Sequence, residues 1–440
     1  MFETLKNAFK VKEIRVKIWF TLLFLLLYRV GSYIPVPGIG DELLASTDLD
    51  LSYLNIMNMM TGGSLAMGTL FAMGVGPYIN SSIIMQLLAV AIPALERLSK
   101  QGEEGRKKIG QYTRYLTIVL AIVQAIGIVL NYSNGISTPT NGGQSLTSLC
   151  FGQEWLAYVV VVLFYTAGTV ITMWIGERIT DYGVSNGISL LIFAGIVSSA
   201  GQSFINMVQN LWVVDGEGLN NFWKLVAMVL AIVVVFVAIV TVELAERKIP
   251  VQYAKQVRGQ KMYGGQSTVI PIKVNSNGVL PLIFAFSILS FPELIMTLFG
   301  WADSEFGLWW AQWMGTGSWL YMVVLTLLII FFAYFYTSIQ FNPDDISKSI
   351  QQNGGFIMGI RPGKPTAQYL KKISGRITLF GAIFLAILAL VPSIVFQAID
   401  MSNANSFTAT GLLIVVSVAL EFNTALESQI MMKNYKGFLK

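Results

Sequence analysis

Histidine is absent from this 440-residue sequence, and cysteine occurs only once, at Cys150. The absence of histidine excludes zinc triads, histidine-ligated haem and acid/base catalysis by imidazole. A single cysteine cannot form an intrachain disulfide or supply the thiolates of an iron–sulfur cluster. Together these two shortages argue against a redox protein.

Charged residues are also scarce. Asp, Glu, Lys and Arg make up 12% of the chain and hydrophobic residues make up 54%, whereas charged residues make up about 25% of an ordinary soluble protein. A soluble chain of this length exposes too much surface to cover with so few charges. The composition therefore predicts a membrane protein.

Long apolar runs supply the membrane spans. A helix needs about 20 mostly apolar residues to cross a bilayer, and ten runs of this kind are bounded by charges, prolines or glycines. We therefore expect an all-α polytopic membrane protein with ten spans, the next best counts being nine and eleven. The spans are expected near residues 18–35, 75–95, 112–132, 155–175, 187–208, 222–243, 279–300, 318–339, 376–397 and 409–430.

The basic residues are distributed unevenly. Twenty-seven of the 29 Lys and Arg residues fall in the two tails and in alternate loops. The intervening loops carry acids instead, among them Asp41, Asp215 and Asp400. Because cytoplasmic loops of membrane proteins are enriched in Lys and Arg, this alternation predicts that both termini face the cytoplasm.

Residues 54–71 are apolar but too short to cross the membrane, and Gly62 and Gly63 interrupt them. Irregular backbone at membrane depth survives only where protein shields it or where it lines a watery cavity. The segment is therefore expected to re-enter a cavity from the outer side. An amphipathic helix on the outer surface is the alternative.

Two loops on the cytoplasmic side are too long to be simple connections. Residues 246–277 predict a basic hairpin that turns at residues 263–266. Residues 341–375 are rich in turn residues and hold Arg361 between Gly359 and Pro362. Such basic projections suit the docking of a large acidic or polyanionic partner. The alternative explanation for the scattered lysines of these loops is the general enrichment of cytoplasmic loops in basic residues, without a docking role.

The predicted spans carry no charge at their centres, where ion-coupled transporters place substrate or proton sites. The chain also lacks the GxxxxGK[ST] motif that grips ATP phosphates, so energy must come from partners. The polar residues near the centres of the spans are uncharged. They either form hydrogen bonds between helices or line a path for a polar polypeptide, and the sequence does not distinguish these two roles. They include Ser82, Gln86, Gln124, Asn186 and Ser287.

Five short motifs follow one another along the chain: Gly-Ser-Tyr-Ile-Pro-Val-Pro-Gly at 31–38, Gly-Pro-Tyr-Ile-Asn-Ser-Ser-Ile-Ile-Met-Gln at 76–86, Gly-Gln-Tyr-Thr-Arg-Tyr at 110–115, Asn-Gly-Ile-Ser at 186–189 and Gly-Ile-Arg-Pro-Gly at 359–363. In this order they resemble the SecY family of bacterial protein-translocation channels. The resemblance extends from the first span to the C-terminus. It implies a channel that moves unfolded secretory polypeptides across the plasma membrane and releases membrane proteins sideways into the bilayer.

The resemblance also implies an architecture. Two five-helix halves of inverted topology, residues 1–210 and 211–440, would surround a central pore, and residues 54–71 would form a re-entrant plug. Five spans is an odd number, so the second half must be inverted, in agreement with the charge pattern. The plug residues would be Asn58, Met60, Gly62 and Gly63. The second and seventh spans would form a lateral gate, to which the five polar residues named above are assigned.

A pore ring follows from the same resemblance. Bulky apolar side chains dewet a narrow constriction and block ions, yet they offer no hydrogen bonds to a sliding chain. The ring residues would be Val75, Ile79, Ile188, Ile192, Ile283 and Ile414, and without the resemblance ordinary packing would explain them. Ile329 is expected to face lipid instead.

The family further implies partners. SecE and SecG would be companion subunits, and the SecA motor or a ribosome would drive substrates that bear signal sequences. The motor or ribosome would dock on Lys255, Arg258, Lys261 and Arg361. The channel would lie in a bacterial plasma membrane, and membrane-protein clients would pass from it into the lipid. We expect no enzyme activity, no cofactor and no metal. An accessory translocon with few clients is the nearest alternative, and a small-solute secondary transporter is a more distant one.

Overall fold

The computed structural model describes residues 2–37, 52–131, 154–213, 218–253, 256–258, 261–263, 268–275, 278–299, 301, 304–315, 318–398 and 409–437. These residues are mostly helical, and a helix lies at each of the ten predicted spans. The ten helices are α2 (Lys12–Gly31), α5 (Gly76–Ala91), α7 (Glu103–Asn131), α10 (Glu154–Tyr182), α11 (Gly187–Val213), α12 (Gly218–Leu244), α13 (Leu280–Phe299), α15 (Trp319–Gln340), α17 (Lys364–Ala398) and α18 (Ala409–Gly437).

Not every one of these helices could cross a membrane on length and composition alone. Among the described residues, five pass that test, namely α7, α10, α15, α17 and α18, and α5 with α6 (Pro93–Ser99) is a sixth if the pair counts as one span. The pair is bent by 107°. Ile92 has extended backbone directly before Pro93, as expected because proline disfavours helical geometry in the preceding residue. The predicted span at 75–95 therefore ends at this bend.

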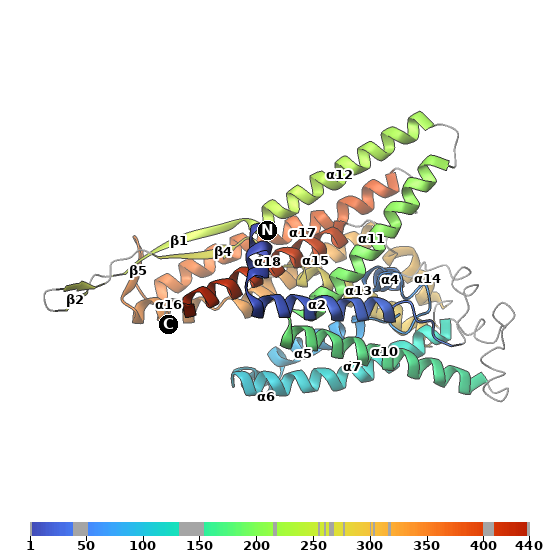
Figure 1. Cartoon of the computed structure of the whole chain (residues 1–440), viewed down its shortest axis with the longest axis horizontal. Coiled ribbons are helices and arrows are strands. Elements are labelled where there is room, and N and C mark those ends of the chain that lie inside the picture. Colours follow the sequence, from blue (N-terminus) through green and yellow to red (C-terminus); the bar gives the residue numbers. More distant parts are fainter. Residues whose placement is uncertain are drawn as a thin grey trace.

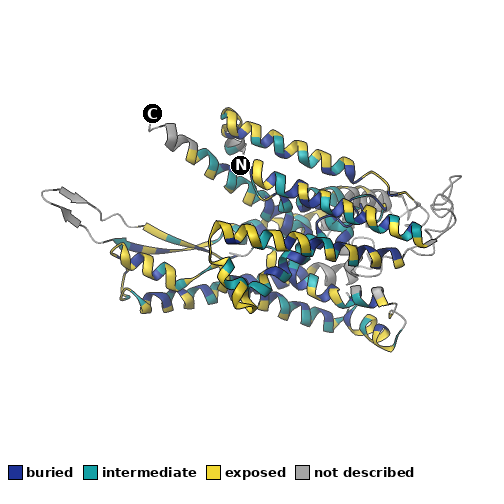
Figure 2. Ribbon diagram, turned by 90° about the horizontal axis from the view of Figure 1, so that it is seen from below, coloured by how far each residue is buried: buried dark blue, intermediate teal, exposed yellow. Residues whose placement is uncertain are grey.

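The long helices run in broadly the same direction, with strands projecting from one end and α14 (Glu305–Met314) at the other (Figure 1). The short helix α1 (Phe2–Lys10) packs on α2 and α18. Exposed residues follow the outer sides of the helices and buried residues their inner sides (Figure 2). Many of the exposed residues are apolar, including Leu26 at 60%, Leu163 at 62% and Leu327 at 61% exposure. An apolar exterior of this kind is suited to lipid.

The basic hairpin predicted for residues 246–277 is present. Strands β1 (Glu246–Tyr253) and β4 (Thr268–Lys273) pair antiparallel, and β2 (Gln256–Arg258) pairs with β3 (Lys261–Tyr263) in the same register. Because Arg258 pairs with Lys261, the chain reverses between these two residues. The turn predicted at residues 263–266 is therefore wrong, since Tyr263 already pairs with Gln256.

The two projections that the sequence predicts to be cytoplasmic form a single unit, which the sequence did not predict. Residues 341–375 supply α16 (Pro343–Gln352) and β5 (Gly355–Ile357), and β5 pairs with the free edge of β1 in a three-stranded sheet ordered β4-β1-β5. The sheet buries Val251 and Ile357 together with Leu370 of α17. This apolar core fixes the sheet to the end of a membrane helix.

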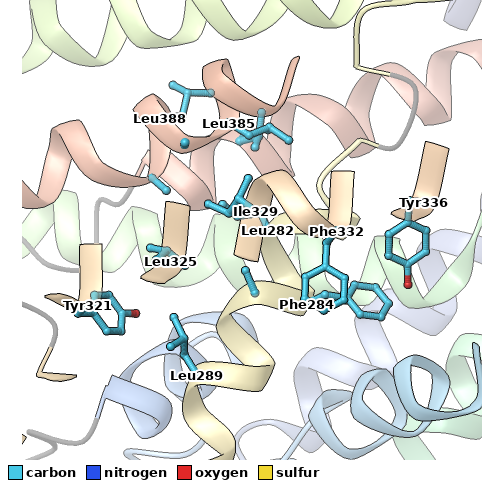
Figure 3. Packing of buried hydrophobic residues seen from close by; sticks show 14 of the residues in the cluster. Leu282, Phe284, Leu289, Tyr321, Leu325, Ile329, Phe332, Tyr336, Leu385 and Leu388 are labelled. Carbon is cyan, nitrogen blue, oxygen red and sulfur yellow. The ribbon is translucent and has the colours of Figure 1, made fainter. Parts of the chain in front are cut away.

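The largest apolar core lies among α13, α15 and α17 (Figure 3). Phe284 of α13 packs against Tyr336 of α15, with ring centroids 4.7 Å apart. Ile329 belongs to this core and has 0% exposure, so the prediction that it faces lipid is wrong. The reason is that α15 is apolar on all sides, and a uniformly apolar helix does not reveal from sequence which face is buried.

Candidate functional site

The segment predicted to re-enter the bundle begins with helix α4 (Ser52–Thr61), which contacts α11 and α13. Met57 and Leu65 are 4% and 0% exposed and share an apolar cluster with α7 and α10. The segment therefore packs among four long helices. A helix lying on the outer surface would leave these side chains exposed.

Asn58, Gly62 and Gly63 end α4. The amides of Gly62 and Gly63 donate to the carbonyls of Met59 and Asn58 at 3.2 and 2.9 Å, and both glycines have positive φ, 72° and 86°. This is the paired hydrogen-bond pattern of a glycine-capped helix end. The Asn58 side chain accepts a further bond from the Ala66 amide at 2.9 Å. These three residues shape the segment's main chain rather than contact a ligand.

Two glycines of the surrounding helices let the segment approach closely. A Cβ atom at Gly195 of α11 would overlap the carbonyl oxygen of Met60, and one at Gly168 of α10 would overlap that of Leu70. Ser199, one helical turn after Gly195, donates to the carbonyl of Met59 at 3.1 Å. The segment is thus held largely through its main-chain oxygens.

Arg29 of α2 also lies beside the segment. Its guanidinium donates to the Ser198 hydroxyl of α11 and lies over the Tyr33 ring at 5.6 Å. A Cβ atom at Gly62 would come within 2.6 Å of Arg29 Nη1. Arg29 therefore joins α2 to α11 at the point where α4 ends.

Five of the six predicted ring residues belong to one apolar cluster, hereafter the ring cluster. Val75, Ile192 and Ile414 are buried in it, and Ile79 and Ile188 pack against it. They come from α11, α18 and the start of α5, so both halves of the chain contribute. Met60 packs against the same cluster. Ile283 of α13 is half-buried and is not one of its members.

Two of the predicted gate residues take part in a hydrogen-bonded contact between the halves. The hydroxyl of Tyr336 on α15 donates to Gln86 Oε1 on α5 at 2.9 Å, and Gln86 Nε2 donates to Ser82 Oγ at 3.1 Å. Tyr336 is 2% exposed. The sequence did not point to Tyr336, because one tyrosine among many aromatic residues carries no distinguishing pattern.

The other three gate residues are not brought into this contact. Asn186 caps α11, accepting from the amides of Ile188 and Ser189 at 3.0 and 3.4 Å. Ser287 is half-buried on α13. Gln124 of α7 has 0% exposure, and neither atom of its amide has a hydrogen-bond partner among the described residues.

Three of the four predicted docking residues are described: Arg258 and Lys261 on the two-stranded β2-β3 hairpin, and Arg361 on the turn after β5. Arg361 is exposed, and its carbonyl accepts from Thr366 Oγ1 at 2.8 Å. Gly359 and Gly363 flank it with positive φ, and the Gly363 carbonyl accepts from Ser347 Oγ at 2.7 Å. Arg258 and Lys261 pair across β2 and β3, whereas Lys255 lies outside the described residues.

Metal chemistry has no support in the described part of the chain, where no three Asp, Glu, His or Cys residues are grouped so as to hold an ion. The described residues instead bring together an apolar cluster from both halves of the chain, an internal segment packed on it, and a hydrogen bond between the halves.

Comparison with known sequences agrees with this arrangement. The SecY family profile matches residues 69–423. The chain is 41% identical to the protein translocase subunit SecY of Halalkalibacterium halodurans over 443 residues, covering 100% of both chains. It is 40% identical to the protein of the same name from Streptomyces coelicolor over 453 residues, again covering 100% of both.

Solved structures show the same fold. One described as a protein-conducting channel matches with a TM-score of 0.60 at 18% identity, covering 95% of this chain and 92% of the other. A second, from work on how the plug domain of SecY stabilises the closed channel, matches at 0.60 and 19% identity, covering 94% and 91%. Canine Sec61, in a ribosome-channel complex, matches at 0.59 and 19%, covering 94% and 91%.

Proposed function

The chain belongs to the SecY family and is a subunit of a protein-conducting translocation channel, and we propose that residues 54–71 are the plug that closes it at rest. The observation that carries this proposal is the packing of Met60 on the ring cluster beside Val75, Ile192 and Ile414. A segment seated there lies against the residues expected to line the narrowest part of the pore. It must leave before a polypeptide can pass.

The ring cluster would seal the pore around whatever occupies it. Its side chains come from α5, α11 and α18, so the seal does not depend on a single helix. Apolar side chains exclude water from a narrow constriction and bind a passing polypeptide weakly. Residues 1–210 and 211–440 would be the two halves that separate when the seal opens. Ile283 would join the ring only after a shift of α13.

The contact between Tyr336 and Gln86 would hold the lateral gate closed. It joins α5 in the first half to α15 in the second half at 2.9 Å, and Phe284 of α13 packs on the same tyrosine. A membrane-protein client that leaves sideways between α5 and α13 must break this contact. The amide of Gln124 is buried and has no partner within the described ranges; it would gain hydrogen bonds when the gate admits water or substrate.

The three-stranded sheet and the turn at Arg361 would dock the cytosolic partner. Arg361 is exposed on a turn whose main chain is fixed by Thr366, and Arg258 and Lys261 lie opposite each other on the hairpin. A relative of this fold, canine Sec61, is bound to a ribosome, which supports a ribosome as one partner. The SecA motor would be the other.

Replacing Arg361 with Glu tests this docking surface. Because the side chain is exposed and its turn is fixed by main-chain bonds, the variant should insert normally but couple poorly to the motor, since a carboxylate cannot reproduce the guanidinium's contacts. Motor-driven export into vesicles is the measurement. Lys348→Glu, a charge reversal elsewhere in the same projection, is the control. Normal export by Arg361→Glu would remove this residue from the docking site.

The remaining parts of the assembly follow from the family. SecE and SecG would bind the apolar exterior as small companion subunits, and the complex would lie in a bacterial plasma membrane with both termini in the cytoplasm. The chain itself would have no enzymatic activity, because the energy for transport comes from the motor or ribosome.

Cysteine crosslinking tests the plug directly. With Cys150 changed to Ser, cysteines at Met60 and Ser199 should be joined by a short thiol crosslinker in the idle channel, because Ser199 bonds the carbonyl next to Met60. The crosslink should disappear when a stalled substrate fills the pore. Met67, which is 50% exposed, should be labelled by bulky external reagents when Met60 is not. Equal crosslinking in both states would contradict the proposal.

A secondary transporter for small solutes is the competing function, since such proteins also use broken helices. Its mark would be a charged or ion-coordinating site at mid-membrane. Purification in mild detergent separates the two: a small one-span or three-span companion favours the translocation channel, and a chain that purifies alone favours the transporter.

A further inference from the structure

Tryptophan is concentrated in one short part of the chain. Five of the ten tryptophans fall within residues 301–319, a stretch that contains α14 and connects α13 to α15. In Figure 1, α14 lies at the end of the molecule opposite the sheet. None of the functions assigned above requires aromatic residues at this place.

Helix α14 has two unlike faces. Gly307 and Met314 are buried, and Trp310 packs against the core formed by α13, α15 and α17. On the other side, Phe306, Trp309 and Leu308 are 52%, 47% and 62% exposed, and Trp313 is 38% exposed. Phe306, Trp309 and Trp313 follow one another at helical spacings of three and four, so they form a single stripe. The only charge in the helix is Glu305, at its first residue.

Exposed apolar residues also flank α14 along the chain. Trp301 precedes it and Trp319 begins α15, and they are 52% and 64% exposed. Beyond Trp319, the residues at four-residue intervals along α15 are Val323, Leu327 and Phe331, exposed at 47%, 61% and 58%. The span that follows α14 therefore begins with an exposed Trp and presents an apolar face suited to lipid.

We propose that α14 is an interfacial helix that lies in the membrane surface, with Phe306, Trp309 and Trp313 inserted at the boundary between headgroups and acyl chains. Tryptophan is enriched at this depth because its indole ring has an apolar body and a polar N–H group. Phenylalanine is common on the inserted face of interfacial helices. Helices that lie in the interface insert a face rich in Trp, Phe and Leu, which is the composition of the exposed face of α14. The partner of this face is lipid, because the face is uncharged and aromatic and the adjoining span α15 exposes Trp319, Val323 and Leu327 as an apolar face suited to lipid.

The placement has a mechanical consequence. Ser304 caps the start of α14 and Ser318 caps the start of α15, accepting from the amides of Gly307 and Tyr321 at 3.1 and 3.3 Å. The Ser318 hydroxyl also donates to the carbonyl of Trp313. These bonds tie α14 to the next span at a fixed turn. An α14 anchored in the interface would hold the adjoining ends of α13 and α15 at one depth in the bilayer.

Spin labels test this placement in the complete channel reconstituted into liposomes. With Cys150 changed to Ser, single labelled cysteines are placed at Trp309 and Trp313, and at Leu308 as a site whose substitution removes no aromatic ring. Leu327, exposed at mid-span, is the lipid reference, and Met358, which is 68% exposed beside β5, is the water reference. The measurement is collision of each label with oxygen, which favours lipid, and with a water-soluble nickel chelate.

The oxygen-to-nickel ratio at the three α14 sites should lie between the two references, well above that of Met358. A ratio equal to that of Met358 would place the face in water and overturn the proposal. Low collision rates with both reagents would mean that a protein covers the face, which would also overturn it. Quenching by lipids brominated close to the headgroup provides a second readout, and it should weaken in a Trp309→Phe, Trp313→Phe double variant.

Discussion

The two contacts that we propose to move in this channel are built from different groups. At the proposed plug, the main-chain oxygen of Met60 occupies the space that a side chain at Gly195 would fill. At the proposed lateral gate, a side-chain hydrogen bond, 2.9 Å long, joins Tyr336 to Gln86. One contact depends on a missing side chain and the other on a hydroxyl group.

This difference sets how each contact responds to change. A main-chain oxygen against a glycine cannot adjust, because neither group has a flexible end, so any added side chain must displace the segment. A side-chain hydrogen bond can be lost while the packing around it stays in place. The plug should therefore respond to substitution in an all-or-none manner, and the gate in a graded one.

Gly195→Val should have the largest effect. Overpacking of a well-packed site typically costs about 1–3 kcal/mol and occasionally more, and here the added atoms meet backbone. We expect the plug to leave its seat and the idle channel to leak ions. Vesicle ion flux is the measurement, and Gly201→Val is the control, because a Cβ atom at Gly201 of the same helix meets no atom within 4 Å. If vesicles containing either variant show the same low ion flux, the close contact at Gly195 does not hold the plug in place.

Ile414→Asn should come second. Burying one such side chain is worth roughly 1.5–3 kcal/mol, and an amide in the ring is satisfied only when the pore wets. About 1.4 kcal/mol changes a population tenfold, so the variant should leak at rest and accept clients with defective signal sequences. Ile283→Asn should leak less, since Ile283 lies outside the ring cluster.

The lipid-exposed Leu327, 61% exposed, replaces the buried Ile329 as the control for the ring. Leu327→Asn should insert at equal levels and stay tight in single-channel recordings. If the Ile414→Asn channel leaks no more ions than the Leu327→Asn channel, the ring cluster is ordinary packing and does not seal the pore.

Tyr336→Phe should have the smallest effect. It removes one hydroxyl and keeps the ring against Phe284, and hydrogen bonds between membrane helices average about 0.6 kcal/mol. We expect the gate to open a few times more readily, measured as improved export of a client with a weakened signal sequence. Tyr334→Phe is a matched control, because the Tyr334 hydroxyl donates to Gly375 within the second half, at 3.0 Å. Equal effects of the two variants would show that the bond across the halves has no special role.

The parts of the fold that could be predicted from sequence are those that extend over many residues. Ten apolar runs and the alternation of basic loops each involve about 20 residues or whole loops, so single exceptions do not mask them. The hairpin at 246–277 was predicted because its strands alternate, but its turn was misplaced: two glycines at 264 and 265 suggested a turn, whereas the pairing of Arg258 with Lys261 puts the reversal earlier.

The contacts of the site depended on tertiary neighbours and were largely hidden. Nothing in the sequence around Gly195 reports that a carbonyl from residue 60 approaches it, and Tyr336 meets Gln86 across 250 positions. The pairing of β5 with β1 likewise joins two loops, 246–277 and 341–375, that are separated by three helices in the sequence. Asn58, by contrast, was chosen for the plug from the family resemblance, and its role in ending α4 is local.

The proposed plug packs its main-chain oxygens against two glycines, Gly195 and Gly168, and this affects how sequences of the family can diverge. A carbonyl oxygen is the same in every amino acid, so residues 60 and 70 can be exchanged without changing what Gly195 and Gly168 accommodate. We therefore expect residues 60 and 70 to tolerate substitution better than the two glycines against which their carbonyl oxygens lie. Substitution of Met60 or Leu70 would keep these two main-chain contacts while changing side chains that pack on the ring cluster, whereas the two wall glycines should tolerate almost no replacement.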